Sequence, residues 1–190
     1  MNTTNILVAG VGGQGSLLAS KILGVLFSMK GLDVKCSEVH GMSQRGGGVV
    51  TYMRAGEKIY APIVPKGEAD LLIAFEQLEA LRWLSHLRPD GKVFMSTQTV
   101  PPMPVLTGAA DYPEDITAQA LGRFPGSKAV DALAIARECG SEQTANIVVL
   151  GMASNVMPYG DSAWKEALAA CIKPRYIEMN YKAFELGKEA

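Results

Sequence analysis

The sequence predicts an α/β fold: a Rossmann-like parallel sheet with an additional antiparallel sheet or hairpin, and flanking helices. An apolar stretch at Asn5–Ala9 has the continuous pattern of a strand buried on both faces, and a glycine-rich turn and a helix follow it. The stretch Ala69–Phe75 repeats that pattern ahead of a second helix. Val49–Met53 and Lys58–Pro62 flank Arg54–Glu57 as the two strands of a hairpin would.

The other elements follow from apolar spacing and from residues that end helices. Ser16–Met29 has apolar residues at helical spacing and ends at Gly31, and a strand is expected at Asp33–Val39. Further helices are expected at Glu76–Leu87, Ile116–Phe124, Ala132–Glu138, Ala145–Val156, Ala163–Cys171 and Tyr176–Gly187, and strands at Lys92–Ser96 and Ser127–Val130. The proline-rich stretch Thr97–Ala110 predicts a loop with at most a short edge strand. With no internal repeat and no linker, residues 1–190 are expected to form a single domain.

Composition narrows the classes of partner. The chain of 190 residues is 48% hydrophobic and 19% charged, which is typical of a globular protein. Its net charge of -1 provides no basic surface for a phosphate backbone, so nucleic acid is not an expected partner.

Membrane, metal and cluster sites are also not expected. The apolar run Ile6–Val11 is too short to span a bilayer, and no basic segment precedes it, so a cytoplasmic protein is expected. Cys36, Cys139 and Cys171 form no CxxC pair, so neither a zinc site nor an iron–sulfur cluster is expected from this chain alone. There is no Walker lysine, and no thiamine diphosphate motif.

The first candidate site is the glycine-rich turn between the first strand and the first helix, with the sequence Gly10-Val11-Gly12-Gly13-Gln14-Gly15. Glycines at this position let backbone N–H groups approach an anion at the helix N-terminus. Glu38, near the end of the second strand, could hold a ribose if that anion were the pyrophosphate of a dinucleotide. The alternative is that the glycines only permit close packing of the strand on the helix.

The second candidate site is the loop segment Gln44-Arg45-Gly46-Gly47-Gly48. Successive glycines expose backbone N–H groups, and Arg45 could hold a phosphate or carboxylate through two hydrogen bonds. Two other interpretations remain open: a flexible turn with a solvated arginine, or a loop that docks into a partner subunit and completes its active site.

Four further residues have simpler expected roles. His40 beside the glycine loop could act as a general base, although a solvated histidine is the more usual case. Asn146 is expected to cap a helix, Asn180 to hydrogen-bond backbone, and Cys36 to be a small core residue.

The order of these motifs resembles a known family. The segments GVGGQGSLLASKILG, VHGMSQRGGGVV, ADLLIAF, ANIVVLG and EMNYKAFELGKEA are similar to the gamma-type subunit of 2-oxoacid:ferredoxin oxidoreductases. HGMSQRGGGVV is most similar to the beta subunit of the indolepyruvate enzyme. The likeness extends across nearly the whole chain.

The resemblance implies a small subunit that is inactive alone and carries no catalytic residue of its own. Such enzymes decarboxylate a 2-oxoacid on thiamine diphosphate, pass electrons through iron–sulfur clusters to ferredoxin and transfer the acyl group to coenzyme A. Thiamine diphosphate and the clusters are expected on the large subunit. The two glycine loops would lie at the contact with that subunit, and Arg45 would reach a coenzyme A phosphate or a partner carboxylate.

Two other functions remain open from the residues alone. A free-standing NAD(P)-binding dehydrogenase would use the first glycine turn, but no acid–base pair for hydride transfer accompanies it and the second loop stays unexplained. A scaffold protein without a role in catalysis is the other.

Overall fold

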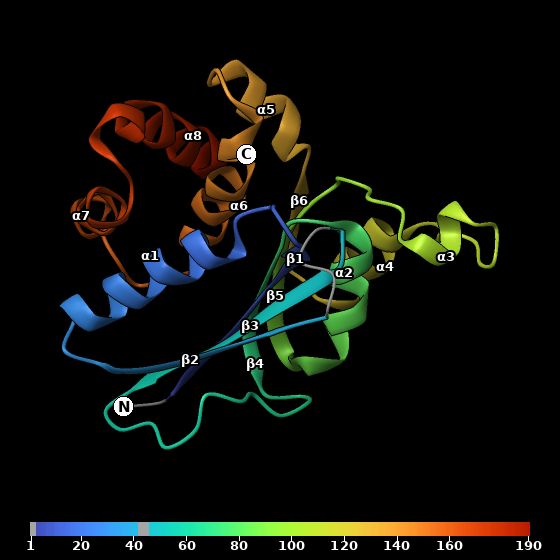
Figure 1. The fold of residues 1–190 in the computed structure, drawn as a ribbon. Coiled ribbons are helices and arrows are strands. Elements are labelled where there is room, and N and C mark those ends of the chain that lie inside the picture. Colours follow the sequence, from blue (N-terminus) through green and yellow to red (C-terminus); the bar gives the residue numbers. More distant parts are fainter. Residues whose placement is uncertain (1–2, 42–45) are drawn as a thin grey trace.

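The computed structural model describes residues 3–41 and 46–190 and confirms the predicted α/β class (Figure 1). Within the described residues, the strands form one six-stranded sheet in the order β2-β3-β1-β4-β5-β6. The strands are β1 (Thr4–Val11), β2 (Asp33–His40), β3 (Gly48–Gly56), β4 (Ala69–Ala74), β5 (Leu87–Ser96) and β6 (Lys128–Val130). The run β1, β4, β5 and β6 is parallel, whereas β3 is antiparallel to both β1 and β2.

Helices cover both faces of the sheet (Figure 1). One layer comprises α1 (Ser16–Met29), α5 (Ala132–Glu138), α6 (Ala145–Ser154), α7 (Asp161–Cys171) and α8 (Ile177–Glu189). The other comprises α2 (Gln77–Trp83) and α4 (Ile116–Arg123), and the short helix α3 (Met103–Leu106) projects away from the body. Single 3-10 turns lie at Leu84–His86, Glu142–Thr144 and Pro174–Tyr176.

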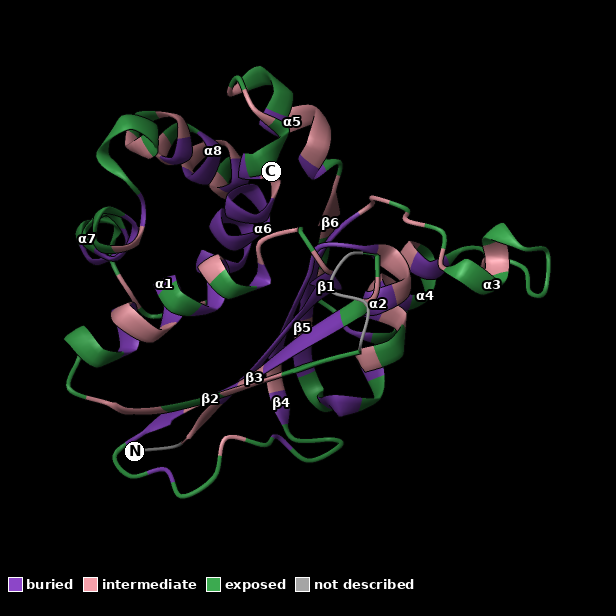
Figure 2. Ribbon diagram, viewed as in Figure 1, coloured by how far each residue is buried: buried purple, intermediate pink, exposed green. Residues whose placement is uncertain are grey.

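The central strand β1 contributes to two hydrophobic cores, one on each side of the sheet. Ile6 and Val8 belong to the core under α1 and α6, whereas Leu7 and Ala9 belong to the core under α2 and α4. Figure 2 shows the mostly buried strands β1, β3, β4 and β5 between the two helical layers, and β2 with intermediate and exposed residues. Because successive side chains of a strand point to opposite faces, a strand buried on both faces is continuously apolar, as the sequence pattern predicted.

Helix α1 has the predicted bounds. Its end is set by Gly31, whose φ of +74° places it in the left-handed region. The N–H groups of Gly31 and Leu32 donate to the carbonyl oxygens of Ser28 and Phe27, at 2.9 and 3.3 Å. This closure satisfies carbonyl groups that the end of a helix otherwise leaves free.

The predicted hairpin between Val49–Met53 and Lys58–Pro62 is wrong. Residues 58–62 form no strand, and the antiparallel hairpin is made instead by β2 and β3. Strand β3 has β2 on one side and β1 on the other, so both of its hydrogen-bonding edges are occupied and a further strand cannot pair with it. The two end residues of the predicted loop belong to strands, because His40 ends β2 and Gly48 begins β3.

The predicted helix Glu76–Leu87 is shorter in the structure. It ends as α2 at Trp83 and continues as a 3-10 turn, and residues 89–91 lie within β5. There Ala69 pairs with Leu87 while Leu71 pairs with Lys92, so β5 bulges opposite β4. A bulge accommodates a proline in a strand because the ladder is already interrupted there.

The other elements lie within a few residues of their predicted bounds. The loop Thr97–Ala110 contains a short helix and, in the part of the chain that the structure describes, no strand. Cys36 is exposed, so its assignment to the core is wrong. It lies on β2, one of the two edge strands of the sheet. The sequence pattern predicted a strand there but did not show that the strand lies at an edge.

Candidate functional site

The two glycine-rich segments predicted as sites lie side by side at the carboxyl end of β1. The backbone N–H of Gly12 donates to the carbonyl oxygen of Gly47 over 2.9 Å. Gly48 begins β3 and pairs with Val11 at the end of β1. The carboxyl ends of parallel strands are where open α/β sheets bind ligands, so this edge is the candidate site.

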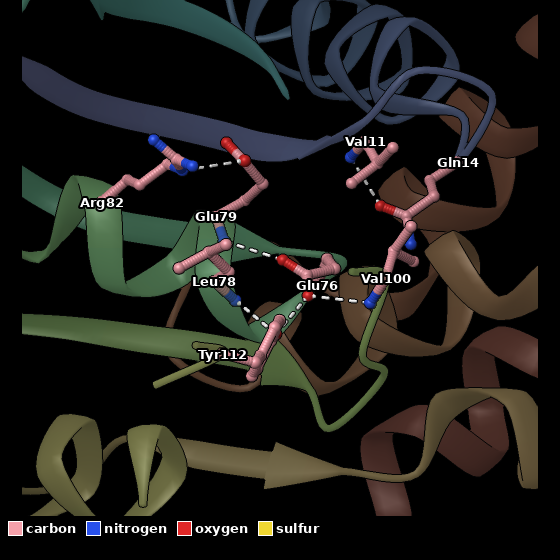
Figure 3. Close-up of polar contacts among 8 residues, drawn as sticks. All are labelled: Val11, Gln14, Glu76, Leu78, Glu79, Arg82, Val100 and Tyr112. Atoms are coloured by element: carbon pink, nitrogen blue, oxygen red, sulfur yellow. Dashed lines mark hydrogen bonds and ion pairs between the residues drawn. The ribbon is translucent and has the colours of Figure 1, made fainter. Parts of the chain in front are cut away.

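Gln14 ties the first turn to the ends of two neighbouring strands. Its Oε1 accepts a hydrogen bond from Val11 N–H at 2.7 Å (Figure 3). Its Nε2 donates to the carbonyl oxygen of Phe75 at 3.1 Å and to Oε1 of Gln98 at 2.9 Å. Both polar atoms of the Gln14 side chain are thus hydrogen-bonded within the chain, and these bonds stabilise the turn.

Gly13 and Gly15 occupy the left-handed region of the backbone, with φ of +102° and +85°. A Cβ atom on Gly13 would meet nothing within 4 Å, so the backbone at this residue is open to an approaching group. A Cβ atom on Gly15 would stand 2.3 Å from Nδ2 of Asn146. Gly15 therefore serves close packing, whereas Gly13 leaves room for a ligand or partner.

Asn146 does not cap its helix as predicted. Thr144 occupies the N-cap position of α6, and Asn146 is the second residue of the helix, with 3% of its surface exposed. Its Nδ2 donates to the carbonyl oxygen of Gly15 at 3.1 Å, so it links α6 to the first glycine turn. The contact joins residues 131 positions apart, which local capping rules cannot predict.

The second glycine segment is described in part. Gln44 and Arg45 lie outside the described residues, so the prediction that Arg45 binds an anion stays a prediction. Gly46 has a φ of +78°. Gly46–Gly48 line a cavity of about 510 Å³ together with His40, Glu79, Arg82 and Trp83, among other residues.

Glu38 and His40 border a cavity of about 410 Å³ with the first glycine turn. Glu38 lies on β2, however, and β3 separates β2 from β1. In dinucleotide-binding dehydrogenases the second strand lies directly beside the first, so the topology differs from the dehydrogenase arrangement. His40 is exposed, and its Nδ1 lies 2.8 Å from the carbonyl oxygen of Gly41.

Glu76 holds together three segments at this edge (Figure 3). Its carboxylate is buried, with 1% of the residue exposed. Oε2 accepts from the backbone N–H of Glu79 at 2.8 Å and so caps α2. Oε1 accepts from Val100 N–H at 3.1 Å and from the Tyr112 hydroxyl at 2.5 Å. Burial, and then the hydrogen bond to Glu76, raise the pKa of Tyr112, so its hydroxyl remains a donor.

Glu79, one turn further along α2, faces the second glycine segment. Its Oε1 lies 3.2 Å from Nε of Arg82 (Figure 3). Burial raises the pKa of the Glu79 carboxyl, and the positive charge of Arg82 offsets part of that rise. A methyl group on Gly48 would stand 2.7 and 2.8 Å from its two carboxylate oxygens.

Residues 5–190 match the family described as Pyruvate ferredoxin/flavodoxin oxidoreductase. The chain belongs to this oxidoreductase family. It is 40% identical over 195 residues to the indolepyruvate oxidoreductase subunit IorB of Thermococcus kodakarensis, with 100% of this chain and 96% of that protein covered. The resemblance predicted from the motifs is thus confirmed, as is the function of a subunit of a 2-oxoacid oxidoreductase.

Solved structures have the same fold. Pyruvate oxidoreductase subunit PORC of Thermotoga maritima superposes with a TM-score of 0.74 at 19% identity, covering 100% of this chain and 97% of that one. The 2-oxoglutarate:ferredoxin oxidoreductase of Magnetococcus marinus, with 2-oxoglutarate, coenzyme A and succinyl-CoA bound, superposes with a TM-score of 0.73 at 20% identity. The match covers 100% of this chain and 31% of that chain, so the fold also occurs as one part of a longer polypeptide.

The side chains of this oxidoreductase subunit do not fit an iron–sulfur cluster. Cys36 lies on β2, Cys139 follows α5 and Cys171 ends α7. Across residues 3–41 and 46–190, no group of three or more histidine, cysteine, aspartate or glutamate side chains could hold a metal ion. Nor does any helix in those ranges combine the length and apolarity needed to cross a membrane.

Sequence reasoning missed Glu76 and Glu79 as residues of the candidate site. The available signal was their position: Glu76 directly follows the buried strand ADLLIAF, and Glu79 comes three residues later, where the carboxyl ends of parallel strands meet. Asn180 lies within α8, where its Nδ2 donates to the carbonyl oxygen of Tyr176 at 2.8 Å, as expected of a residue bonded to backbone.

The raised pKa of Glu79 predicts a pH-dependent stability difference between the wild type and Glu79→Gln. A raised folded-state pKa contributes stability that is fully present below the ordinary value of 4.5 and is lost as pH rises through the folded-state value. We therefore expect the wild type to gain stability relative to Glu79→Gln as pH falls from about 7 to about 4.5. Urea unfolding across this range measures the difference, with Glu166→Gln on the exposed face of α7 as the control. A difference that is constant with pH, or that shifts against the wild type on acidification, would contradict this account.

Proposed function

We propose that this chain is the small subunit of an indolepyruvate:ferredoxin oxidoreductase that acts on aryl pyruvates in the cytoplasm. It is proposed to act as one gamma-type domain over residues 1–190. The observation that carries the substrate class is the 40% identity to an indolepyruvate oxidoreductase subunit over the full length of this chain. The enzyme would decarboxylate the 2-oxoacid oxidatively and transfer the acyl group to coenzyme A, with ferredoxin as electron acceptor.

The cofactors are proposed to lie on a large partner subunit. Thiamine diphosphate, when bound there, supplies the carbanion chemistry that decarboxylation needs. The wide separation of Cys36, Cys139 and Cys171 supports placing the iron–sulfur clusters on the partner as well. The solved 2-oxoglutarate enzyme with coenzyme A bound supports coenzyme A as cosubstrate.

The site of contact with the partner is proposed to include the two glycine segments. Its residues are Gly10, Gly12, Gly13, Gln14, Gly15, Gln44, Arg45, Gly46 and Gly47. The hydrogen bond from Gly12 to Gly47 supports this because it makes one continuous surface of two separate motifs. Two exposed apolar side chains lie beside that surface, Leu17 at 65% and Val39 at 51% exposure. Exposed apolar groups next to an open polar site are typical of a subunit contact.

Purification of the tagged chain from its native cells under anaerobic conditions tests the proposed function. We expect a large iron–sulfur subunit to co-purify and the eluate to reduce a dye in the presence of indolepyruvate and coenzyme A. Pyruvate and 2-oxoglutarate, two 2-oxoacids without an aryl group, serve as control substrates. Purification without a partner would contradict the subunit assignment, and a preference for either control substrate would contradict the aryl pyruvate assignment.

Arg45→Ala tests the predicted anion contact in the same complex. We expect about a tenfold loss in affinity for the large subunit or about a tenfold rise in KM for coenzyme A, because a charge-assisted contact to an anion is lost. Arg175→Ala, at an exposed position before α8, is the control. Unchanged assembly and unchanged coenzyme A dependence would remove Arg45 from the site.

A further inference from the structure

Gly48, the last residue of the Gly46–Gly48 segment, packs directly on the carboxylate of Glu79. A Cβ atom added to Gly48 would stand 2.7 Å from Oε2, 2.8 Å from Oε1 and 2.9 Å from Cδ of Glu79. These distances are shorter than van der Waals contact. Gly48 is not among the described residues with positive φ, so its backbone would tolerate alanine. The requirement for glycine at position 48 thus comes from the neighbouring carboxylate.

The Glu79 carboxylate is held in place by its own helix. Its Oε1 lies 3.2 Å from Nε of Arg82, and the neighbouring Trp83 side chain also lowers the pKa of the carboxyl, which favours the charged form. The backbone N–H of Glu79 is bonded to the Glu76 side chain at the N-cap of α2. With 7% of the residue exposed, Glu79 is buried, so its side chain has little room to move.

The opposite side of this segment is joined to the first glycine turn. Gly47 accepts the hydrogen bond from Gly12, and Gly48 pairs with Val11. Gly46–Gly48 therefore lie between two supports, the first turn and α2. A cavity of about 510 Å³ opens beside them, and Glu79, Arg82 and Trp83 line it.

We propose that Glu79 is a positioning residue: the volume of its side chain sets where Gly46–Gly48 lie, and so sets the geometry in which these three glycines meet the large subunit and coenzyme A. This inference rests on the proposed function, since the consequence for catalysis passes through that contact. In this proposal Glu79 acts through Gly46–Gly48 and not through a contact of its own with substrate or cofactor. Because the effect depends on the volume of the side chain and not on its charge, Glu79→Gln should leave the position of Gly46–Gly48 unchanged.

The test uses the assembled complex with Gly48→Ala, Glu79→Ala, the double variant and Glu79→Gln. We expect Gly48→Ala to raise KM for coenzyme A, or to weaken assembly, about tenfold while kcat in the saturated complex changes less than about twofold. Glu79→Ala is expected to give a smaller effect of the same kind, and Glu79→Gln to behave as the wild type. In the double variant the added methyl group meets no carboxylate, so its defect should match that of Glu79→Ala alone.

A spectroscopic measurement on the full chain separates this inference from the proposed function. The chain has two tryptophans, Trp83 beside the cavity and Trp164 in the core. With fluorotryptophan incorporated, fluorine NMR of Gly48→Ala should show a shifted Trp83 resonance and an unchanged Trp164 resonance. In the Glu79→Ala background, adding Gly48→Ala should move the Trp83 resonance no further than Glu79→Ala alone does. That outcome supports the positioning role even if no large subunit binds.

Two results would overturn the inference. One is additivity: a double variant whose defects equal the sum of the single defects would mean that Gly48 and Glu79 act independently. The other is an unmoved Trp83 resonance in Gly48→Ala, which would mean that the added methyl group does not displace the carboxylate.

Discussion

Gly151→Ala is expected to lower the free energy of unfolding by roughly 3 kcal/mol, or about 9 °C in melting temperature. Gly151 lies in α6, whose residues from Asn146 to Ser154 are all buried. A Cβ atom at this position would stand 2.1 Å from the carbonyl oxygen of Phe184 in α8. The obstructing atoms belong to backbone, so a side-chain rotation cannot relieve the clash and the two helices must separate.

The close contact between α6 and α8 involves a glycine on each helix, which supports the expected loss of stability. A Cβ atom on Gly187 of α8 would stand 2.1 Å from the carbonyl oxygen of Val148 in α6. The two helices thus approach through two glycines, one from each side, and Gly187→Ala should destabilise the protein to a similar extent.

Gly24→Ala is the matched control for this pair. Gly24 also lies inside a helix, α1, but a Cβ atom there would meet nothing within 4 Å. Since alanine is favoured over glycine in a helix interior, Gly24→Ala should raise stability by about 0.5–1 kcal/mol. Thermal unfolding of the three variants measures the effects. If Gly151→Ala shifted the melting temperature in the same direction as Gly24→Ala, the close approach of α6 and α8 would be disproved.

Glu76→Ala is expected to lower the free energy of unfolding by roughly 3 kcal/mol. The change removes the acceptor for three donors, on Glu79, Val100 and Tyr112. It also removes the N-cap of α2, and a lost cap alone costs about 1 kcal/mol. Because buried donors without acceptors keep their full desolvation cost, the loss should exceed that of an ordinary exposed hydrogen bond.

Urea unfolding of Glu76→Ala, Glu76→Gln and Glu166→Ala checks this prediction. Glu76→Gln keeps one acceptor oxygen and should lose about half as much stability as Glu76→Ala. Glu166 is exposed on α7, so Glu166→Ala should remain within about 0.5 kcal/mol of the wild type. Equal stability of Glu76→Ala and Glu166→Ala would show that the Glu76 network does not hold α2 in place.

Sequence patterns correctly predicted the helices and strands that are determined by residues close together in the chain. Helix α1 has the predicted bounds because apolar spacing and Gly31 act within one stretch of chain. The prediction of the hairpin was wrong because an alternating pattern indicates a strand but not the strand with which it pairs. Strand β3 pairs with β2 on one side and β1 on the other, so the segment 58–62 has no free edge of β3 to join. Glu76 was seen only as the start of a helix, since its partners Val100 and Tyr112 lie 24 and 36 residues away.

The sequence by itself determined the α/β class, the family and the two glycine segments, because hydrophobic period, glycine content and motif order are properties of the chain as written. The tertiary structure alone decided that Gly12 bonds to Gly47, that Asn146 packs on Gly15 and that Glu79 packs on Gly48. These contacts depend on strand order, which places β3 beside β1, and on the packing of α2 and α6 at the carboxyl edge of the sheet. Such pairings join residues far apart in the chain, where propensities and spacing carry no information about which surfaces meet.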